Sequence, residues 1–351
     1  EGFRLWQQAA ERIPTHLPPA PHALRLAPYD PVNLDPAQGA DWELFSGLVE
    51  LTPEADVVPD VAYGWDVRDD GHAYVFHLRD DVQWSDGVPV TASDFEFAWK
   101  RVLDPATGSP CAFLLLDLRG ARAFHRGETS DPGAVGVPAR DDRTLAVELE
   151  SPVAYFLQLT ANIGPPPVPR HVVQELGGAW AEPENLVTNG PFQLESWQEG
   201  RPLVVVRHPR YHGLFSGNLQ RVELYGPAIM SDRELVSLYE ADGLDRLTIG
   251  GLLSDLEFVR AYERNATDFV MPTVGGVAYY AFDVTRPPFD DVRVRRAFAL
   301  ATDVATHWDP AIVPPARGGF VPPGIPAHQP GIGLPYDPEG ARQLLAEAGY
   351  P

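Results

Sequence analysis

Apolar residues along this chain change repeatedly between the spacing of strands and the spacing of helices. Every second position is apolar over 23–27, 61–67 and 74–78, which predicts strands. The last two segments flank Asp69-Asp70-Gly71, a tight-turn sequence, so we expect them to form a hairpin. Strands and helical stretches continue to alternate to the end of the chain. This alternation predicts an α/β or mixed α+β fold.

The helical spacing is clearest after Thr91-Ala-Ser-Asp94, which has the pattern of a capping box. Phe95, Trp99 and Leu103 then recur on one face, which predicts an amphipathic helix. Shorter matches to the same spacing predict further helices, and one late apolar run predicts a strand. These expected elements are a helix over 42–49, a helix starting at Pro152, a strand over 277–282, and a helix capped by Asp290 with Val294, Ala297, Phe298 and Ala301 on one face.

The length of 351 residues is too great for one ordinary hydrophobic core, so two or three lobes are expected. We expect a short helix and a proline-rich linker in 1–22, and a first lobe over 23–250 with an inserted subdomain at about 50–185. The beginning of a second lobe is expected over 251–351. The first residues contain no apolar core of a signal peptide, so they are read as a spacer and the sequence as an excised piece of a longer protein.

The charge and the cysteine content exclude several classes of function. With 49 acidic and 27 basic residues the formal net charge is −22, which argues against nucleic-acid binding. Cys111 is the only cysteine, so neither an intrachain disulfide nor a thiolate metal site is expected. No apolar run approaches the roughly 18 residues of a membrane span. We expect no metal and no cofactor.

Motifs of enzymes are also missing from the sequence. It contains no Gly-x-Ser-x-Gly, no Gly-x-Gly-x-x-Gly, no phosphate-binding P-loop and no His-Glu-x-x-His. Adjacent aspartates such as Asp80-Asp81 and Asp141-Asp142 fall at turns, where their side chains bond to nearby backbone N–H groups. The sequence therefore does not predict an enzyme, and a hydrolase is a distant alternative.

Several motifs occur in an order that is typical of one family. They are Val58-Pro-Asp-Val-Ala-Tyr-Gly-Trp65, Trp84-Ser-Asp-Gly87, Thr188-Asn-Gly-Pro-Phe192, Pro287-Pro-Phe-Asp-Asp-Val-Arg-Val-Arg-Arg-Ala297 and Tyr336-Asp-Pro-Glu-Gly-Ala-Arg-Gln-Leu-Leu-Ala-Glu-Ala-Gly349. Together they resemble the family 5 extracellular solute-binding proteins, which include the oligopeptide, dipeptide and nickel-complex binders of ABC importers.

The resemblance implies a two-lobed periplasmic-binding-protein fold of class II, with its second lobe incomplete because family members continue well past the last helix. In the peptide binders of the family, that continuation supplies the acid that pairs with the ligand amine. The resemblance further implies capture of a peptide or similar small polar solute between the lobes. The ligand-binding residues implied in this way are Tyr29, Asn33, Gln38, Trp42, Phe113, Ile163, Asn189, Gly190, Tyr280 and Asp283. The family usually has Asn at the position of Asp283, so a cationic ligand is one consequence to consider.

The implied partners are the permease subunits of an ABC importer. The protein is expected to be a monomer in the periplasm or at the cell surface, where a lipid anchor is one option. The same fold also occurs as the ligand-sensing domain of multidomain regulators. That alternative would place the protein in the cytoplasm, and it stays open because no targeting segment is visible.

Overall fold

The computed structural model describes most of the chain between residues 23 and 350. The chain divides into two units, Glu1–Phe258 and Val259–Pro351, and each is described by itself. The predicted helix and linker of 1–22 lie outside the described residues. Within the described part, no helix is both long and apolar enough to span a membrane. The described residues are 23–27, 33–38, 44–52, 56–163 (with only the backbone of 162 and 163), 165–198, 200–213, 218–226, 230–248, 279–303, 321, 329 and 331–350.

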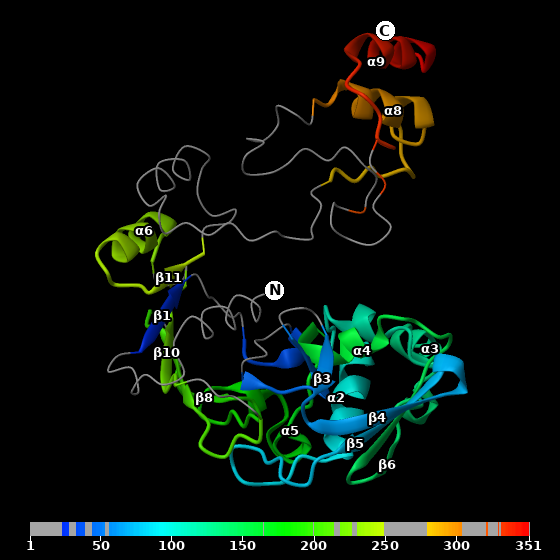
Figure 1. Ribbon diagram of the computed structural model, residues 1–351. Coiled ribbons are helices and arrows are strands. Elements are labelled where there is room, and N and C mark those ends of the chain that lie inside the picture. The colour runs from blue at the N-terminus through cyan, green and yellow to red at the C-terminus, as the bar shows by residue number, and fades with distance from the viewer. Residues whose placement is uncertain are drawn as a thin grey trace. The chain divides into compact units, whose positions relative to one another are not determined.

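A five-stranded sheet is one of the two main sheets of the first unit (Figure 1). Its strand order is β11-β1-β10-β9-β8, in which β1 runs parallel to both of its neighbours and β9 antiparallel to both of its own. The run Leu203-Val-Val-Val206 makes β9 apolar on both faces, as suits a strand with neighbours on each side. The strands are β1 Leu24–Ala27, β8 Phe192–Ser196, β9 Leu203–Arg207, β10 Arg221–Leu224 and β11 Arg246–Leu247.

The other main sheet of the first unit has four antiparallel strands in the order β4-β5-β7-β6. The predicted hairpin is confirmed as β4 and β5, whose connecting residues Asp69 and Asp70 both adopt a left-handed φ of 52°. Aspartate tolerates this conformation better than most residues. The strands are β4 Ala62–Arg68, β5 Ala73–Leu78, β6 Ala139–Asp141 and β7 Thr144–Glu148, and a separate pair consists of β2 Val49–Leu51 and β3 Val57–Pro59.

The predicted amphipathic helix is confirmed as α2, Ala92–Leu103, which contacts β6 and β7. The Asp94 carboxylate accepts the backbone N–H of Thr91 at 2.8 Å, and the Thr91 side chain accepts the backbone N–H of Asp94, which together form the capping box. The other helical elements of this unit are η1 Pro36–Gln38, η3 Asp69–Gly71, η4 Ala112–Leu115, α3 Ala121–His125, η5 Pro132–Ala134, α4 Phe156–Gln158, η6 Leu159–Ile163, α5 Arg170–Leu176, η7 Gly177–Ala181 and α6 Asp232–Glu240.

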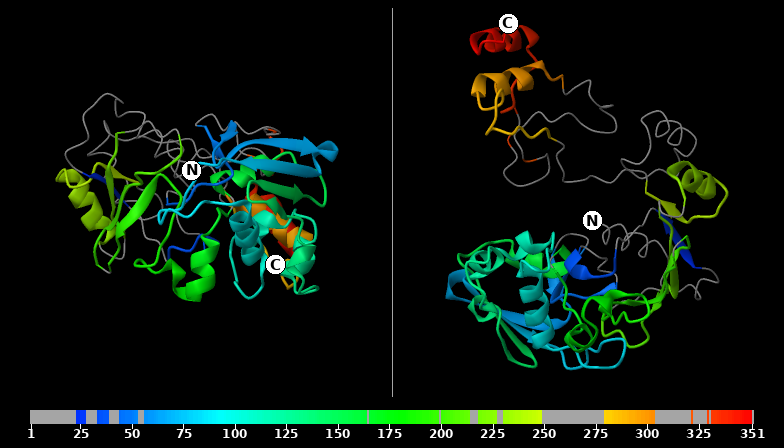
Figure 2. Two further views of the ribbon diagram at one scale, coloured as in Figure 1. Left: turned by 90° about the horizontal axis from the view of Figure 1, so that it is seen from below. Right: turned by 180° about the vertical axis from the view of Figure 1, so that it is seen from behind.

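One large core of buried side chains joins the two sheets of the first unit. It includes the large aromatic residues Phe45, Phe76, Trp84, Trp99 and Phe192, all nearly inaccessible to solvent. A second, small cluster lies under α6, which packs beside β11 in the views of Figures 1 and 2. Burial of the apolar surface in this core is the main stabilising contribution to the first unit.

The described part of the second unit contains two packed helices, α8 Val292–Ala301 and α9 Pro338–Glu347 (Figure 2). An Arg293 guanidinium nitrogen donates to the carbonyl of Glu347 at 2.7 Å, so the first turn of α8 holds the end of α9. The α8 helix is capped by Asp291 rather than by the predicted Asp290. Of the expected apolar face, Val294 and Ala297 are buried, whereas Phe298 and Ala301 are exposed.

Three expected elements are wrong in the described residues. Leu44 to Val49 do not form the predicted helix, because Val49 enters β2 and pairs with Pro59. Pro152 does not begin a helix, which starts instead at Phe156. The segment from Tyr279 to Phe282 is not a strand. In the first case, pairing with a distant strand decided the conformation of a short apolar run.

Candidate functional site

The loop after β1 contains two of the predicted ligand residues, Asn33 and Gln38. The side-chain oxygen of Asn33 accepts the backbone N–H of Asp35 at 2.9 Å. A carboxylate oxygen of Asp35 accepts the N–H of Ala37, also at 2.9 Å. These two Asx-type turns fold the described segment 33–38, called the 33–38 loop below, into a defined backbone shape that ends in η1.

The Asp35 carboxylate also fixes the 33–38 loop to helix α2. Both terminal guanidinium nitrogens of Arg101 donate to it, Nη1 at 2.9 Å from Oδ1. The side chains of Arg101 and Asp35 are 22% and 11% exposed. On its other side the Arg101 guanidinium lies 5.8 Å from the ring centre of Trp180. The result is a two-pronged, largely buried ion pair, which is among the strongest kinds of side-chain contact.

Two further bonds hold the end of the 33–38 loop to the turn that follows α2. The side-chain amide of Gln38 donates to the carbonyl of Thr107 at 3.2 Å. The hydroxyl of Ser109 donates to the carbonyl of Ala37. The loop that should meet a ligand is therefore fastened at Asp35, Ala37 and Gln38 to one neighbouring element.

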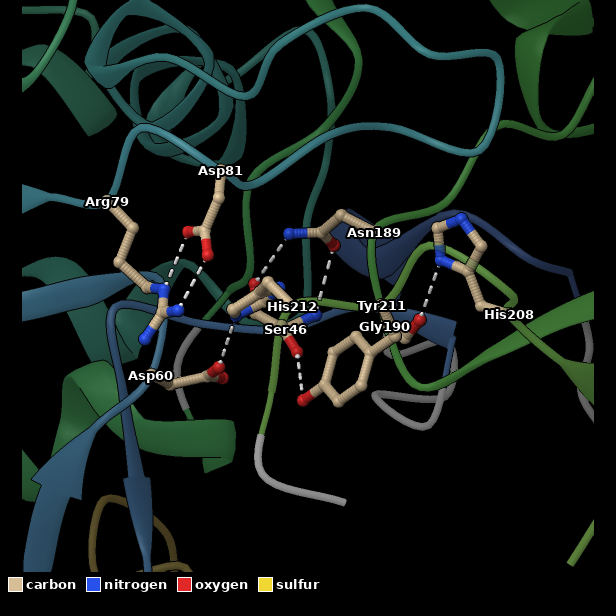
Figure 3. Close-up of polar contacts among 9 residues, drawn as sticks. All are labelled: Ser46, Asp60, Arg79, Asp81, Asn189, Gly190, His208, Tyr211 and His212. Atoms are coloured by element: carbon tan, nitrogen blue, oxygen red, sulfur yellow. Dashed lines mark hydrogen bonds and ion pairs between the residues drawn. The ribbon is translucent and has the colours of Figure 1, made fainter. Parts of the chain in front are cut away.

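Asn189 and Gly190 bond to the segment that precedes β2 (Figure 3). The Asn189 side-chain amide accepts the backbone N–H of Ser46 at 3.0 Å and donates to the carbonyl of Ser46 at 3.1 Å. The N–H of Gly190 donates to the carbonyl of Leu44 at 2.9 Å. Asn189 is buried, and its amide thus pairs with the backbone much as a neighbouring strand would. It positions the chain in the structure, while its contact with a ligand stays a prediction.

A buried histidine–aspartate pair, His212 and Asp60, lies next to this contact, as Figure 3 shows. His212 Nε2 is 2.8 Å from Asp60 Oδ1, and the two side chains are 2% and 4% exposed. Asp60 lies between β3 and β4, whereas His212 follows β9. The pair therefore joins the part of the first unit that contains the four-stranded sheet to the five-stranded sheet.

Tyr211 and Ser46 add a second contact at the same place. Their hydroxyl oxygens are 3.2 Å apart, and Ser46 is buried. Burial raises the pKa of the Tyr211 phenol well above its usual range, and the nearby carboxylate of Asp60 adds to the effect. Tyr211 is therefore a neutral hydroxyl at neutral pH.

Of two titratable groups near the Tyr211–Ser46 contact, Asp81 is paired with an arginine and His208 is uncharged. A bidentate bond from Arg79, at 2.9 and 2.8 Å, lowers the pKa of Asp81 and keeps it ionised. Burial lowers the pKa of His208, whose Nδ1 lies 3.1 Å from the carbonyl of Gly190. We conclude that His208 is neutral at pH 7 and donates from Nδ1 to Gly190.

Ser46, His212 and Asp60 are the residue types of a catalytic triad, but they are not bonded as one. In a triad the histidine accepts from the serine hydroxyl. His212 does bond to Asp60, but the hydroxyl of Ser46 bonds to Tyr211. All the side chains concerned are largely withdrawn from solvent, so the arrangement fastens backbone segments to one another. No group of three or more His, Cys, Asp or Glu side chains in the described part of the chain is placed to hold a metal ion.

The remaining predicted ligand residues are scattered. Phe113, at the start of η4, is 68% exposed, which is unusual for a phenylalanine. In the second unit, Tyr280 is 72% exposed. The Asp283 carboxylate accepts from the N–H and the hydroxyl of Thr285, which lowers its pKa and keeps it charged. Tyr29, Trp42 and the side chain of Ile163 lie outside the described residues.

Comparison with known proteins decides the family. The family described as bacterial extracellular solute-binding proteins, family 5, middle, matches residues 56–351. The chain belongs to this family. The predicted family and its mixed α+β, periplasmic-binding-protein-like fold are therefore confirmed.

Relatives within family 5 include proteins named for different ligands. The chain is 37% identical over 289 residues to the probable deoxycholate-binding periplasmic protein YgiS of Escherichia coli, covering 78% of this chain and 52% of the relative. It is 34% identical over 334 residues to the periplasmic oligopeptide-binding protein OppA of Escherichia coli, covering 92% and 60%. The chain thus spans about half to three fifths of the length of these curated relatives.

Solved structures of the family resemble the chain over most of its length. The crystal structure of Haemophilus influenzae OppA in complex with the peptide RPPGFSPFR matches with a TM-score of 0.76 and 30% identity, covering 94% of this chain and 67% of that one. The Escherichia coli murein tripeptide binding protein MppA matches with a TM-score of 0.77 and 30% identity, covering 93% and 64%.

Sequence reasoning found the loop but not the residues that hold it. Asp35 lay inside the expected ligand segment, yet nothing in the sequence connects it to Arg101, 66 positions away. Asp60 lies within the Val58–Trp65 motif, which gave a signal for its importance but not for its partner. His212 and Tyr211 carried no signal at all.

Proposed function

We propose that this chain captures a peptide or a similar small polar solute for an ABC-type importer and performs no catalysis. One observation carries the proposal: the 34% identity with the oligopeptide-binding protein OppA of Escherichia coli extends over 92% of this chain. The location proposed with it is extracytoplasmic, in the periplasm or at the cell surface. Because the chain spans only part of its relatives, binding by this chain itself is part of the proposal.

The ligand contacts that we propose are those predicted from the family. The geometry of the described residues supports some of them. The 33–38 loop offers a backbone held in one shape by Asp35, which suits recognition of a ligand main chain. Phe113 offers an exposed aromatic face. Tyr280 offers a second aromatic face, and Asp283 offers a carboxylate that lies 3.5 Å from the guanidinium of Arg286.

A steroid acid is a second candidate ligand. It is favoured by the 37% identity with the probable deoxycholate-binding protein YgiS. Deoxycholate is amphipathic and anionic, so it would need apolar surface and a cation rather than the carboxylate that Asp283 provides. We place peptides first, because the similarity to the oligopeptide-binding protein OppA covers 92% of this chain and that to YgiS covers 78%.

Native mass spectrometry separates these ligand classes. The purified chain would be mixed with a pool of short peptides and, separately, with deoxycholate. We expect a 1:1 complex with peptides that survives dilution. A complex with deoxycholate alone would contradict the peptide preference, and no complex with either would contradict the proposal for this chain.

A matched pair of variants adds a test of the proposed contact at Phe113. Phe113→Ala removes an exposed aromatic ring from the proposed ligand contacts, whereas Leu176→Ala removes an exposed apolar side chain at the end of α5. We expect a weaker peptide complex, by roughly tenfold, only for Phe113→Ala, since loss of one buried aromatic contact is worth about 1–2 kcal/mol. Equal effects of the two variants would contradict a ligand contact at Phe113.

The partner and the assembly state are also proposed. Delivery to an importer requires recognition by permease subunits, and the binding protein would act as a monomer. Sedimentation of the chain with and without peptide tests the second point, because a monomer keeps its mass at all protein concentrations. A mass that rises with concentration would contradict it.

A further inference from the structure

The strongest unexplained contact in the first unit is the one between Arg101 and the 33–38 loop. We propose that Arg101 is a positioning residue that holds this loop in the shape in which it contacts the solute. The inference rests on the proposed function. It adds to that function a residue, Arg101, that acts on the ligand only through Asp35. Nothing in the identity of either residue suggests the role, which comes from their geometry.

Asp35 is the centre of this arrangement. Its carboxylate receives three donors at once: two from the Arg101 guanidinium and one from the N–H of Ala37. The residue is buried, and a buried carboxylate is strongly unfavourable unless its charge and its oxygens are satisfied. If Arg101 is removed, the carboxylate loses two of its three donors, and we expect it to move toward water. A carboxylate that moves outward no longer caps Ala37, so the turn at 35–37 opens.

Arg101 is itself held rigidly, which is what a positioning residue requires. It lies in the last turn of α2, where Trp99, Val102 and Leu103 are buried in the main core. Its guanidinium also lies over the ring of Trp180, at 5.8 Å, a favourable cation–π contact. The core helix α2 thus fixes Arg101, Arg101 fixes the carboxylate of Asp35, and that carboxylate fixes the backbone of the loop at Ala37.

The shape of the arginine side chain matters as well as its charge. Two nitrogens bind the two carboxylate oxygens, and the flat guanidinium face meets the Trp180 ring. A lysine ammonium is a point charge that cannot make both prongs and the stacking contact together. A lysine at this position would keep the charge balance but leave the carboxylate free to turn.

A positioned loop would bind more tightly than a mobile one. A loop that is already ordered does not lose conformational entropy when the ligand arrives, and this difference appears directly in the affinity. Gln38, whose amide bonds to Thr107, and Ala37, whose carbonyl accepts from Ser109, would keep the far end of the loop in place. Arg101 therefore acts mainly on the segment around Asp35.

The test combines hydrogen exchange with ligand affinity in four variants. Arg101→Met removes the guanidinium and both of its bonds to Asp35, whereas Arg101→Lys keeps the positive charge. Asp35→Asn keeps the shape of the side chain but removes its negative charge. Arg122→Met is the matched control, because Arg122 pairs with Asp117 at 3.0 Å on the surface. Exchange would be followed at the backbone N–H groups of Asp35, Ala37 and Gln38, since Pro36 has none. Peptide affinity would be measured by calorimetry at a temperature at which every variant is folded.

We expect exchange at 35–38 to rise by roughly tenfold or more in Arg101→Met, by less in Arg101→Lys and Asp35→Asn, and not at all in Arg122→Met. Peptide affinity should fall in the same order, again by roughly tenfold for Arg101→Met, with only part of the loss recovered in Arg101→Lys. A merely structural role would lower the thermal midpoint without this graded loss of affinity.

Two outcomes would overturn the inference: unchanged exchange at 35–38 in Arg101→Met, or increased exchange with wild-type affinity. Failure of the proposed function looks different, because the wild-type chain itself would then retain no solute. In that case the exchange measurement alone would still decide whether Arg101 positions the loop.

Discussion

His212 Nε2 lies 2.8 Å from Asp60 Oδ1, and both side chains are almost completely withdrawn from solvent. The contact joins a loop after β9 to the connection between β3 and β4. It therefore links the two sheets of the first unit through a polar contact within a largely apolar core. A buried pair of this kind makes each partner dependent on the other.

Removal of one partner of this pair should be strongly destabilising. Asp60→Ala leaves a buried imidazole without its acceptor, and His212→Ala leaves a buried carboxylate without its donor. Each is expected to lower the free energy of unfolding by about 3–5 kcal/mol, measured by chemical denaturation.

An exposed pair of the same residue types provides the control. His171 Nε2 is 2.7 Å from Asp86 Oδ2, but the side chains are 38% and 31% exposed. His171→Ala should cost no more than about 1 kcal/mol, as expected for a surface ion pair. Similar losses at His212 and His171 would show that burial of the pair does not determine its contribution.

The side-chain amide of Asn189 should also contribute to stability. Asn189→Ala removes one acceptor and one donor for the backbone of Ser46, both buried, so a loss of about 2–4 kcal/mol is expected. Asn185→Ala is the control, because that amide makes a single exposed bond to the carbonyl of Ala179. Denaturation curves that coincide for the two variants would contradict the role given to Asn189.

The sequence predicted the elements whose signals are local. The capping box at Thr91 and the turn at Asp69-Asp70-Gly71 were read correctly, because neighbouring residues determine those conformations. The helix over 42–49 was wrong, because Val49 pairs with Pro59 in a strand and no periodicity reports that pairing. The motifs identified the family, since they occur in order over most of the chain.

The contacts of the candidate site could be predicted from the sequence only in small part. Asn189 was predicted as a ligand residue from its motif, and its bonds to Ser46 connect positions 143 residues apart. Arg101 was not singled out from the sequence, although it binds a loop in which ligand contacts were expected. Long-range polar contacts of this kind leave no spacing pattern in a single sequence.

The neutral state of His208 predicts a dependence of stability on pH. Burial lowers its pKa in the folded state below the ordinary value of about 6.5. The unfolded chain therefore binds this proton more readily, and folding stability declines as the pH falls from about 6.5 through the lowered pKa. Its Nε2 has no hydrogen-bond partner among the described residues, which adds to the cost of a second N–H.

Comparison with His208→Asn isolates this contribution. An asparagine amide can donate to the carbonyl of Gly190 without titrating, so its stability should fall less steeply than that of the wild type as the pH drops below about 6.5. The measurement is the free energy of unfolding at several pH values. Parallel curves for the two proteins would contradict a buried neutral His208.

The Tyr211 hydroxyl predicts a smaller effect. Tyr211→Phe removes its bond to Ser46 and keeps the ring, so a loss of about 0.5–1.5 kcal/mol is expected in denaturation experiments. In the wild type, the raised pKa should keep this phenol neutral in alkaline ultraviolet titration until the protein unfolds. Ionisation of all tyrosines in the folded protein would contradict its burial.

Calorimetric titration with a short peptide tests the central claim most directly, provided that the peptide is recovered and analysed afterwards. The account predicts saturable 1:1 binding, a negative heat-capacity change from buried apolar surface, and a chemically intact peptide at the end. Absence of saturable binding, or recovery of cleaved peptide, would contradict a solute-binding function without catalysis.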